Sequence, residues 1–284
     1  MAQIRIVSDS TSDIPQELRA NLGIETVPLK VHFGNETFLD SVTITPEQFY
    51  EKLIQATELP TTSQPSPADF VELYKRLLHK PDTEIISIHL SSALSGTYQT
   101  AVLAKSLLEG GEHISVVDSK HASYGVGILA VAAANAARAG KSREEILDLV
   151  KYVRNTMRVY FIVDTLEYLH KGGRIGKASA LFGALLNIKP ILTIDEAGEV
   201  AAVDKIRGSK KAMQRILELL RQDFGDKRVH AVIAHAGVEV DVEELTELVR
   251  GNFAVEDLTH TKIGPVIGTH VGPGTTAVFM YPVQ

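Results

Sequence analysis

The sequence predicts an α/β protein of two domains: an N-terminal three-layer α/β/α domain with a mostly parallel sheet, and a C-terminal α+β domain with a mixed or antiparallel sheet. Three observations carry this prediction. The 284 residues exceed the length of one average domain. Short apolar runs in the first half alternate with helical patterns long enough for right-handed crossovers. In the second half, apolar runs on either side of Ala197-Gly198 are typical of an antiparallel hairpin over residues 188–207.

Helix start signals are clear in the first half. Thr45-Pro46 and Ser66-Pro67 each combine an N-cap residue with a proline at the first helical position. Ser142 and Glu145 have the spacing of a capping box. The expected helices span residues 15–22, 46–55, 68–79, 97–108, 124–139 and 142–157.

Apolar runs between these helices predict the strands of the first half. Two of them are separated by Gly34-Asn35 and are expected to form a hairpin at a sheet edge. The polar, proline-rich segment 59–67 is predicted to be a loop. The expected strands span residues 4–9, 24–33, 36–40, 84–90 and 113–119.

The regular alternation of strand and helix ends near residue 158, where we place the domain boundary. A short helix precedes the glycine-rich segment KGGRIG (171–176). Besides the hairpin, strands are expected at residues 159–164 and 229–235 and twice more toward the C-terminus, with helices at 209–223 and 240–251. The predicted domains are residues 1–158 and 159–284.

Composition excludes several classes of function. Hydrophobic residues make up 44% and the formal charge is -6, which argues against nucleic acid or an anionic membrane as the main partner. The chain has no cysteine, so disulfides, thiolate catalysis and cysteine zinc sites are excluded. The histidine spacing predicts no metal site. Without a signal peptide or a run of eighteen apolar residues, we expect a cytoplasmic protein with no integral membrane segment.

Hydroxyl-rich clusters follow three of the predicted parallel strands, where open α/β sheets bind ligands. A fourth cluster occupies the proline-rich loop. Each cluster alone is equally well explained by helix caps and turns. Together they can donate several hydrogen bonds to an anion, and a helix beginning at Gly96 or Thr97 would add its positive end. This arrangement suits a carboxylate or a phosphate. The clusters comprise Ser8 to Asp13, Ser91 to Gly96, Asp118 with Ser119, and Thr61 to Gln64.

Enzyme signatures are absent from these clusters. SSALSG lacks the G-x-S-x-G pattern, and GGRIGKAS lacks the first glycine and the final Ser or Thr of a P-loop. One catalytic alternative stays open: a hydrolase or transferase that uses Ser95 or His270 on an acyl substrate, with Ser10 and Asp118 nearby. Such chemistry would need a base within hydrogen-bond reach of the nucleophile.

Seven motifs in order across nearly the whole chain resemble the DegV family. That family consists of fatty-acid-binding subunits of bacterial fatty acid kinase systems. The resemblance implies a two-domain protein that encloses one long-chain fatty acid between its domains. The motifs are SDSTSDIP (8–15), PTTSQPSP (60–67), SIHLSSALSGTYQTA (87–101), VVDSK (116–120), KGGRIG (171–176), KIRG (205–208) and GPVIGTHVGPG (264–274).

The resemblance also implies a role for individual residues. Thr62 or its neighbour Thr61, together with Ser95 and Gly96, would hold the carboxyl head, and His270 would lie beside it. Positive charge near the head or at the kinase docking face would come from Arg174 and Arg207. A separate ATP-dependent kinase subunit would phosphorylate the carboxyl for phospholipid synthesis, so this chain would have no catalytic residue and no cofactor of its own.

The acyl tunnel is expected among apolar residues of both halves, although plain core packing explains most of them equally well. The segment 180–188 stands out because Gly183 would leave space for a chain. A passive fatty-acid carrier without a kinase remains an alternative. The tunnel candidates are Ile128, Leu166, Leu181, Phe182, Leu185 and Val266, with Leu129, Leu169, Leu186 and Ile191 as further apolar residues.

Overall fold

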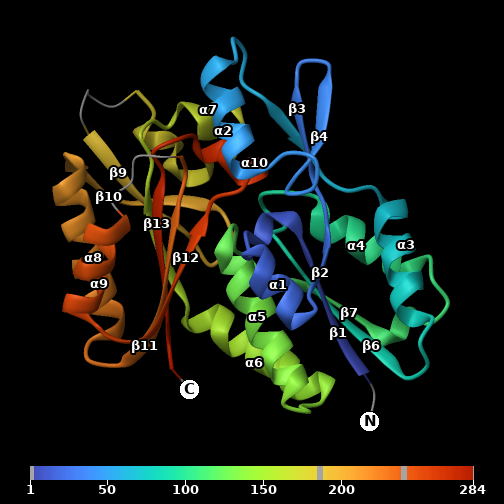
Figure 1. The fold of residues 1–284 in the computed structure, drawn as a ribbon. Coiled ribbons are helices and arrows are strands. Elements are labelled where there is room, and N and C mark those ends of the chain that lie inside the picture. Colours follow the sequence, from blue (N-terminus) through green and yellow to red (C-terminus); the bar gives the residue numbers. More distant parts are fainter. Residues whose placement is uncertain (1–2, 184–187, 238–241, 284) are drawn as a thin grey trace.

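The computed structural model describes residues 3–183, 188–237 and 242–283. A four-stranded parallel sheet of order β2-β1-β6-β7 organises the N-terminal half (Figure 1). Its central strand β6 is buried on both faces, as expected where helices cover both sides of a parallel sheet. Helices α3 and α4 pack on one face and α1 and α5 on the other, which confirms the three-layer prediction. The strands are β1 (Gln3–Asp9), β2 (Glu25–Val27), β6 (Thr83–His89) and β7 (Ile114–Asp118).

The helices of this half begin where their capping signals predict. Thr45, Ser66 and Ser142 each accept a hydrogen bond from the backbone N–H three residues later, and each forms a complete capping box. The helices are α1 (Gln16–Leu22), α2 (Pro46–Gln55), α3 (Pro67–Leu78), α4 (Thr97–Ser106), α5 (Tyr124–Arg138) and α6 (Arg143–Thr156).

A small antiparallel sheet of order β4-β3-β5 departs from two predictions. The strand expected over residues 24–33 is divided at Pro28, which lacks the N–H that a continuous ladder needs. The segment expected as a loop contains β5 (Thr61–Ser63), which pairs with β3 (Lys30–Phe33). Prolines at 60 and 65 flank β5, as is usual for a short edge strand. The hairpin of β3 with β4 (Glu36–Leu39) is confirmed.

The C-terminal half is built on a six-stranded mixed sheet of order β10-β9-β8-β13-β11-β12, in which only β11 and β12 pair in parallel. Helices α8 (Ser209–Phe224) and α9 (Val242–Asn252) cover one face (Figure 1). This arrangement confirms the predicted α+β class. The strands are β8 (Arg158–Ile162), β9 (Ile188–Ile194), β10 (Val200–Arg207), β11 (Arg228–His235), β12 (Ala254–Lys262) and β13 (Thr276–Pro282).

One helix of this half was not predicted. The segment GPVIGTHVG contains α10 (Pro265–Val271), with proline at its first position. Gly272, at a φ of 74°, ends the helix. A proline at the first position and a glycine after the last are both common at helix ends. The seven-residue helix is, however, too short to show a periodic apolar pattern.

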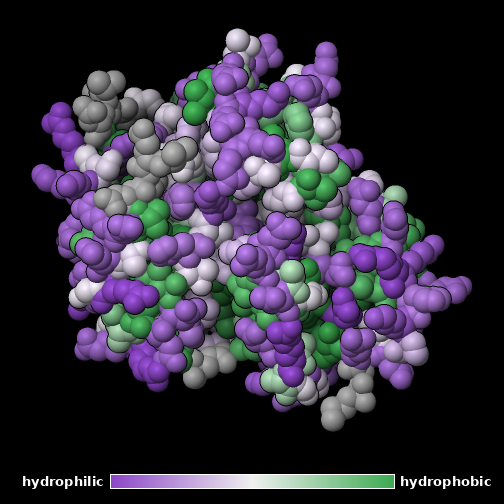
Figure 2. Space-filling model, viewed as in Figure 1, coloured by the Kyte–Doolittle hydropathy of each residue, from purple (hydrophilic) through white to green (hydrophobic). Residues whose placement is uncertain are grey.

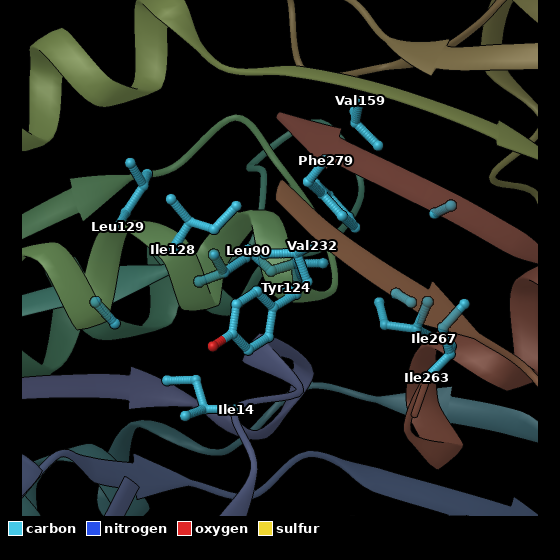
Figure 3. Packing of buried hydrophobic residues seen from close by; sticks show 14 of the residues in the cluster. Ile14, Leu90, Tyr124, Ile128, Leu129, Val159, Val232, Ile263, Ile267 and Phe279 are labelled. Atoms are coloured by element: carbon cyan, nitrogen blue, oxygen red, sulfur yellow. The ribbon is translucent and has the colours of Figure 1, made fainter. Parts of the chain in front are cut away.

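The two halves share one hydrophobic core on the side where they meet. Leu90 and Tyr124 of the N-terminal half lie in the same cluster as Val159, Ile267 and Phe279 of the C-terminal half (Figure 3). The chain passes from one half to the other between the end of α6 at Thr156 and the start of β8 at Arg158. The faces that meet there are apolar.

The outer surface has a different character. Figure 2 shows a face dominated by hydrophilic residues with hydrophobic ones scattered among them. Within the described residues, no helix combines the length and the apolar character that crossing a bilayer would require.

Candidate functional site: a cavity between the two halves

A cavity of about 400 Å³, partly open to the surface, lies in this shared core. Its volume is within the range of about 300–1,000 Å³ that small-molecule sites occupy. Among its described lining residues there is no carboxylate, and Arg174 is the sole permanent cation. The apolar lining comes from both halves and comprises Leu29, Leu90, Leu94, Ala122, Val159, Phe161, Leu169, Ile194, Val200, Ile263, Val266, Ile267, Val271, Ala277 and Phe279.

Thr62 of β5 and His270 of α10 meet at this cavity. Thr62 Oγ1 lies 2.8 Å from His270 Nε2, although 208 residues separate them in the sequence. Burial, with a smaller contribution from nearby Arg174, lowers the pKa of His270 to about 4. The imidazole is therefore neutral at pH 7. Its buried Nδ1 has no hydrogen-bond partner among the described residues.

The His270 ring fits because residue 172 has no side chain. A Cβ at Gly172 would lie 2.3 Å from His270 Nδ1. Gly172 ends α7 (Glu167–Lys171) and opens the KGGRIG turn. Gly172 thus makes room for a site residue from another part of the chain.

Ser95 lies between β6 and α4, at the carboxyl end of the parallel sheet. Its Oγ accepts a hydrogen bond from the backbone N–H of Thr97 at 3.3 Å and lies 2.9 Å from Thr97 Oγ1. The adjoining Gly96 allows a close approach, since a Cβ there would lie 2.2 Å from Gln64 Oε1. Gln64 in turn donates to Thr100 Oγ1 at 2.8 Å. The two hydroxyl-rich loops are therefore joined side by side.

Arg174 connects the C-terminal half to the Ser95 loop. Its Nε donates to the carbonyl of Leu94 at 3.0 Å, and its Nη1 donates to the carbonyl of Gly172 at 2.8 Å. These two bonds hold a half-buried guanidinium at the cavity wall. A positive charge, hydroxyl donors and the N-terminus of α4 together suit an anionic head group attached to an apolar chain.

The structure places the other predicted polar residues less centrally. Thr61 is exposed, because side chains alternate along β5 and Thr62 takes the cavity side. Arg207 is exposed at the end of β10 and does not line the cavity. Of the two adjacent threonines, Thr62 is the one that lines the cavity.

The predicted tunnel residues divide in a similar way. Val266 and Leu169 line the cavity, whereas Ile128, Leu129 and Ile191 are buried in the cores and do not. Leu166 and Leu181 are partly buried away from the lining. Phe182 is 46% exposed and stacks on His170, with ring centroids 3.8 Å apart. Leu185 and Leu186 lie outside the described residues.

The residues that form the main walls of the cavity were not predicted from the sequence. Phe161 of β8, Phe279 and Ala277 of β13, and Ile194 and Val200 beside the hairpin turn all line it. Strand alternation could have identified the inward side of β13, since Ala277 and Phe279 are two residues apart. Nothing local distinguishes an inward residue that borders a void from one that is packed.

Ser95 and His270, the residues of the catalytic alternative, do not form a hydrogen-bonded nucleophile–base pair among the described residues. Ser95 is bonded to Thr97, and His270 to Thr62, rather than to each other. A Ser87–His89–Asp9 chain does exist, with 2.7 Å from Ser87 Oγ to His89 Nε2 and 3.0 Å from His89 Nδ1 to Asp9 Oδ2. All three side chains have 0% exposure, so no substrate reaches them.

Comparison with known proteins agrees with this geometry. The family model described as "Uncharacterised protein, DegV family" matches residues 3–283. A DegV domain-containing protein from Caldanaerobacter subterraneus is 38% identical over 282 residues, covering 98% of this chain and 99% of the relative.

Two solved structures have the same fold over 100% of both chains. A fatty-acid-binding DegV family protein from Thermus thermophilus is 40% identical with a TM-score of 0.93. The fatty acid binding protein DegV from Bacillus subtilis is 36% identical with a TM-score of 0.89. The chain therefore belongs to the DegV family.

Proposed function

We propose that this chain binds one long-chain fatty acid in the cavity between its halves and presents the carboxyl group to a separate ATP-dependent kinase subunit. The acyl phosphate formed there would feed phospholipid synthesis. The observation that carries the binding part is the largely apolar cavity, at which Thr62, Ser95, His270 and Arg174 converge. Two structural relatives are described as binding fatty acids, which supports the same ligand class here.

Affinity in this proposal comes from the chain rather than from the head group. Burying about fifteen methylenes at ~0.8 kcal/mol each is worth roughly 12 kcal/mol before ordering costs. The polar groups then mainly fix the position of the carboxyl. Arg174 already donates two bonds to backbone carbonyls, so it is not a free bidentate clamp. A loosely held carboxylate stays available for phosphoryl transfer.

The chemistry of phosphorylation is assigned to the partner. In this proposal the chain supplies no catalytic residue and needs no cofactor, and ATP belongs to the kinase subunit in the cytoplasm. Arg207 is a suitable docking residue because it is exposed and has no hydrogen-bond or ion-pair partner among the described residues. A passive carrier would bind the same lipid without engaging a kinase.

Native mass spectrometry tests the binding part. We expect the purified chain to carry one added mass of a long-chain carboxylic acid, which disappears under denaturing conditions. Ala277→Trp should abolish the added mass, because Ala277 lines the cavity and a bulky indole would fill it. The matched change Ala202→Trp, at an exposed position of β10, should leave it in place. A wild-type chain without lipid after incubation with palmitic acid would contradict the proposal.

A pull-down with the kinase subunit tests the second part. Arg207→Ala should weaken capture of the kinase roughly tenfold while leaving bound lipid unchanged, since Arg207 lies outside the cavity. Arg76→Ala, an exposed arginine on α3, serves as the control. Undiminished capture by Arg207→Ala would remove Arg207 from the interface, and no capture by the wild type would leave a passive carrier.

A further inference from the structure

The β9–β10 hairpin forms one wall of the cavity. Ile194 and Val200, on either side of its turn, both line the cavity. The two strands pair with each other along their length. Among the described residues, β9 is joined to β8 by the pairs Phe161 with Leu192 and Ile162 with Ile191, and Thr193 Oγ1 donates to the carbonyl of Val159 at 2.7 Å. The base of the hairpin is therefore fixed in the core, where Ile191 and Leu192 are fully buried. The end beyond Thr193 has no strand partner outside the hairpin among the described residues.

The turn at the tip of this hairpin, residues 195–199, is rigid in itself. Asp195 Oδ1 accepts hydrogen bonds from the backbone N–H groups of Ala197 at 3.0 Å and Glu199 at 3.1 Å. The backbone N–H of Asp195 also donates to the carbonyl of Glu199 at 2.9 Å. These three bonds fix the shape of the turn.

Two side chains of the N-terminal half hold this tip. Ser91 Oγ donates to the carbonyl of Gly198 at 2.8 Å, and Lys120 Nζ donates to the carbonyl of Glu196 at 3.0 Å. The approach is close because residue 198 is glycine at a φ of 85°: a Cβ there would lie 2.1 Å from Ser91 Oγ. Both contacts cross from one half of the molecule to the other.

Ser91 also belongs to the head-group loop. Its carbonyl accepts the backbone N–H groups of Leu94 at 3.0 Å and Ser95 at 3.1 Å. The same residue thus holds the tip through its side chain and Ser95 through its backbone. On the other side, Lys177 pairs with Asp195 and, at 3.6 Å, with Glu199. The tip is the point where the wall, the head-group loop and the KGGRIG segment meet.

We propose that residues 195–199 act as a latch: release of the tip from Ser91 and Lys120 lets the end of the β9–β10 hairpin beyond Thr193 swing away and opens the side of the cavity for the acyl chain to enter and leave. This inference rests on the proposed function. It adds an exchange route and assigns to Ser91 the task of coupling that route to the position of Ser95.

A reversible covalent lock tests the latch. The chain has no cysteine, so Ser91→Cys with Gly198→Cys introduces the only two thiols. A Cβ at residue 198 lies 3.2 Å from Ser91 Cβ, close to the spacing of about 3.5–4.5 Å in disulfides. We expect exchange of bound palmitic acid for its deuterated form, followed by native mass spectrometry, to be at least tenfold slower in the oxidised protein. Reduction should restore it, and each single variant should be indifferent to oxidant.

Weakening the latch should have the opposite effect. Ser91→Ala combined with Lys120→Met removes both hydrogen bonds and should speed exchange roughly tenfold. The matched pair Ser106→Ala with Lys52→Met removes one serine and one lysine bond elsewhere and should leave the rate unchanged.

Three results would overturn the latch. Equal exchange rates in the oxidised and reduced forms would show that the hairpin does not gate the cavity. Failure of the two thiols to form a disulfide would show that the tip does not rest on Ser91 in solution. An unchanged rate after loss of both hydrogen bonds would show that these contacts do not restrain it. A wild-type chain that carries no palmitic acid would instead refute the proposed function itself.

Discussion

Replacing Asp40 by asparagine should stabilise the protein increasingly as the pH rises from about 4 to 7. Asp40 is fully buried and accepts hydrogen bonds from Ser10 Oγ at 2.8 Å and Ser41 Oγ at 3.1 Å. Burial raises its pKa from 3.8 to about 7, with a further rise from the charge of Asp9. Half-buried Asp13 nearby has a raised pKa for the same leading reason, and Arg19 compensates only weakly for Asp40.

The direction of this pH dependence follows from the number of protons that the folded and unfolded states bind. Between pH 3.8 and about 7 the folded protein keeps a proton on Asp40 that the unfolded chain has released, so raising the pH favours unfolding. This cost grows to at most about 4 kcal/mol above pH 7. Asparagine has nearly the same shape and no charge, so the variant avoids the cost.

The measurement is the free energy of unfolding in urea at a series of pH values, taken as the difference between variant and wild type. The difference is needed because His121 and His270 oppose Asp40 in the wild type: burial lowers both pKa values to about 4, so their contribution to stability is lost as the pH falls from about 6.5 to 4. Asp148→Asn, an exposed change on α6, should give a flat difference. A flat difference for Asp40→Asn would mean that Asp40 is ionised in the folded state at neutral pH.

A substitution in the KGGRIG turn is also expected to lower the free energy of unfolding strongly, and another glycine of the same turn provides the control. Gly176→Ala should destabilise the fold by about 3 kcal/mol or more, from two independent costs. Residue 176 has a φ of 51°, which side chains disfavour, and a Cβ there would lie 2.5 Å from the backbone carbonyl oxygen of Val200. That oxygen belongs to β10 and cannot rotate away as a side chain would.

Gly173→Ala separates the two costs. Its φ of 69° is equally unfavourable for alanine, but a Cβ there would meet no atom within 4 Å. We expect a loss of only about 1 kcal/mol in the free energy of unfolding, from the backbone alone. Equal losses at both positions, measured by urea denaturation, would show that the turn yields and that the contact with Val200 is not tight.

Local chemistry explains most of the secondary structure. Capping residues such as Thr45, Ser66 and Ser142 act through atoms within three residues of themselves, so their pattern is visible in the sequence. The predicted hairpin around Ala197-Gly198 is also confirmed. Its turn likewise depends on neighbouring residues, so its pattern is visible in the sequence. By contrast, β5 is a strand only because β3 offers it a partner, and three residues between prolines carry no periodic signal of their own.

The features of the candidate site also divide into those that local sequence explains and those that depend on tertiary contacts. The hydroxyl-bearing loops that follow the parallel strands could be predicted from the sequence, because strand ends and helix caps depend on neighbouring residues, and the sequence motifs resemble those of one family. That Thr62 rather than Thr61 faces the cavity, and that Phe161 and Phe279 rather than Ile128 line it, is evident only from the folded structure. A pattern of apolar residues reports that a side chain is buried. Whether it borders a void depends on how segments far apart in the chain fail to fill the space between them.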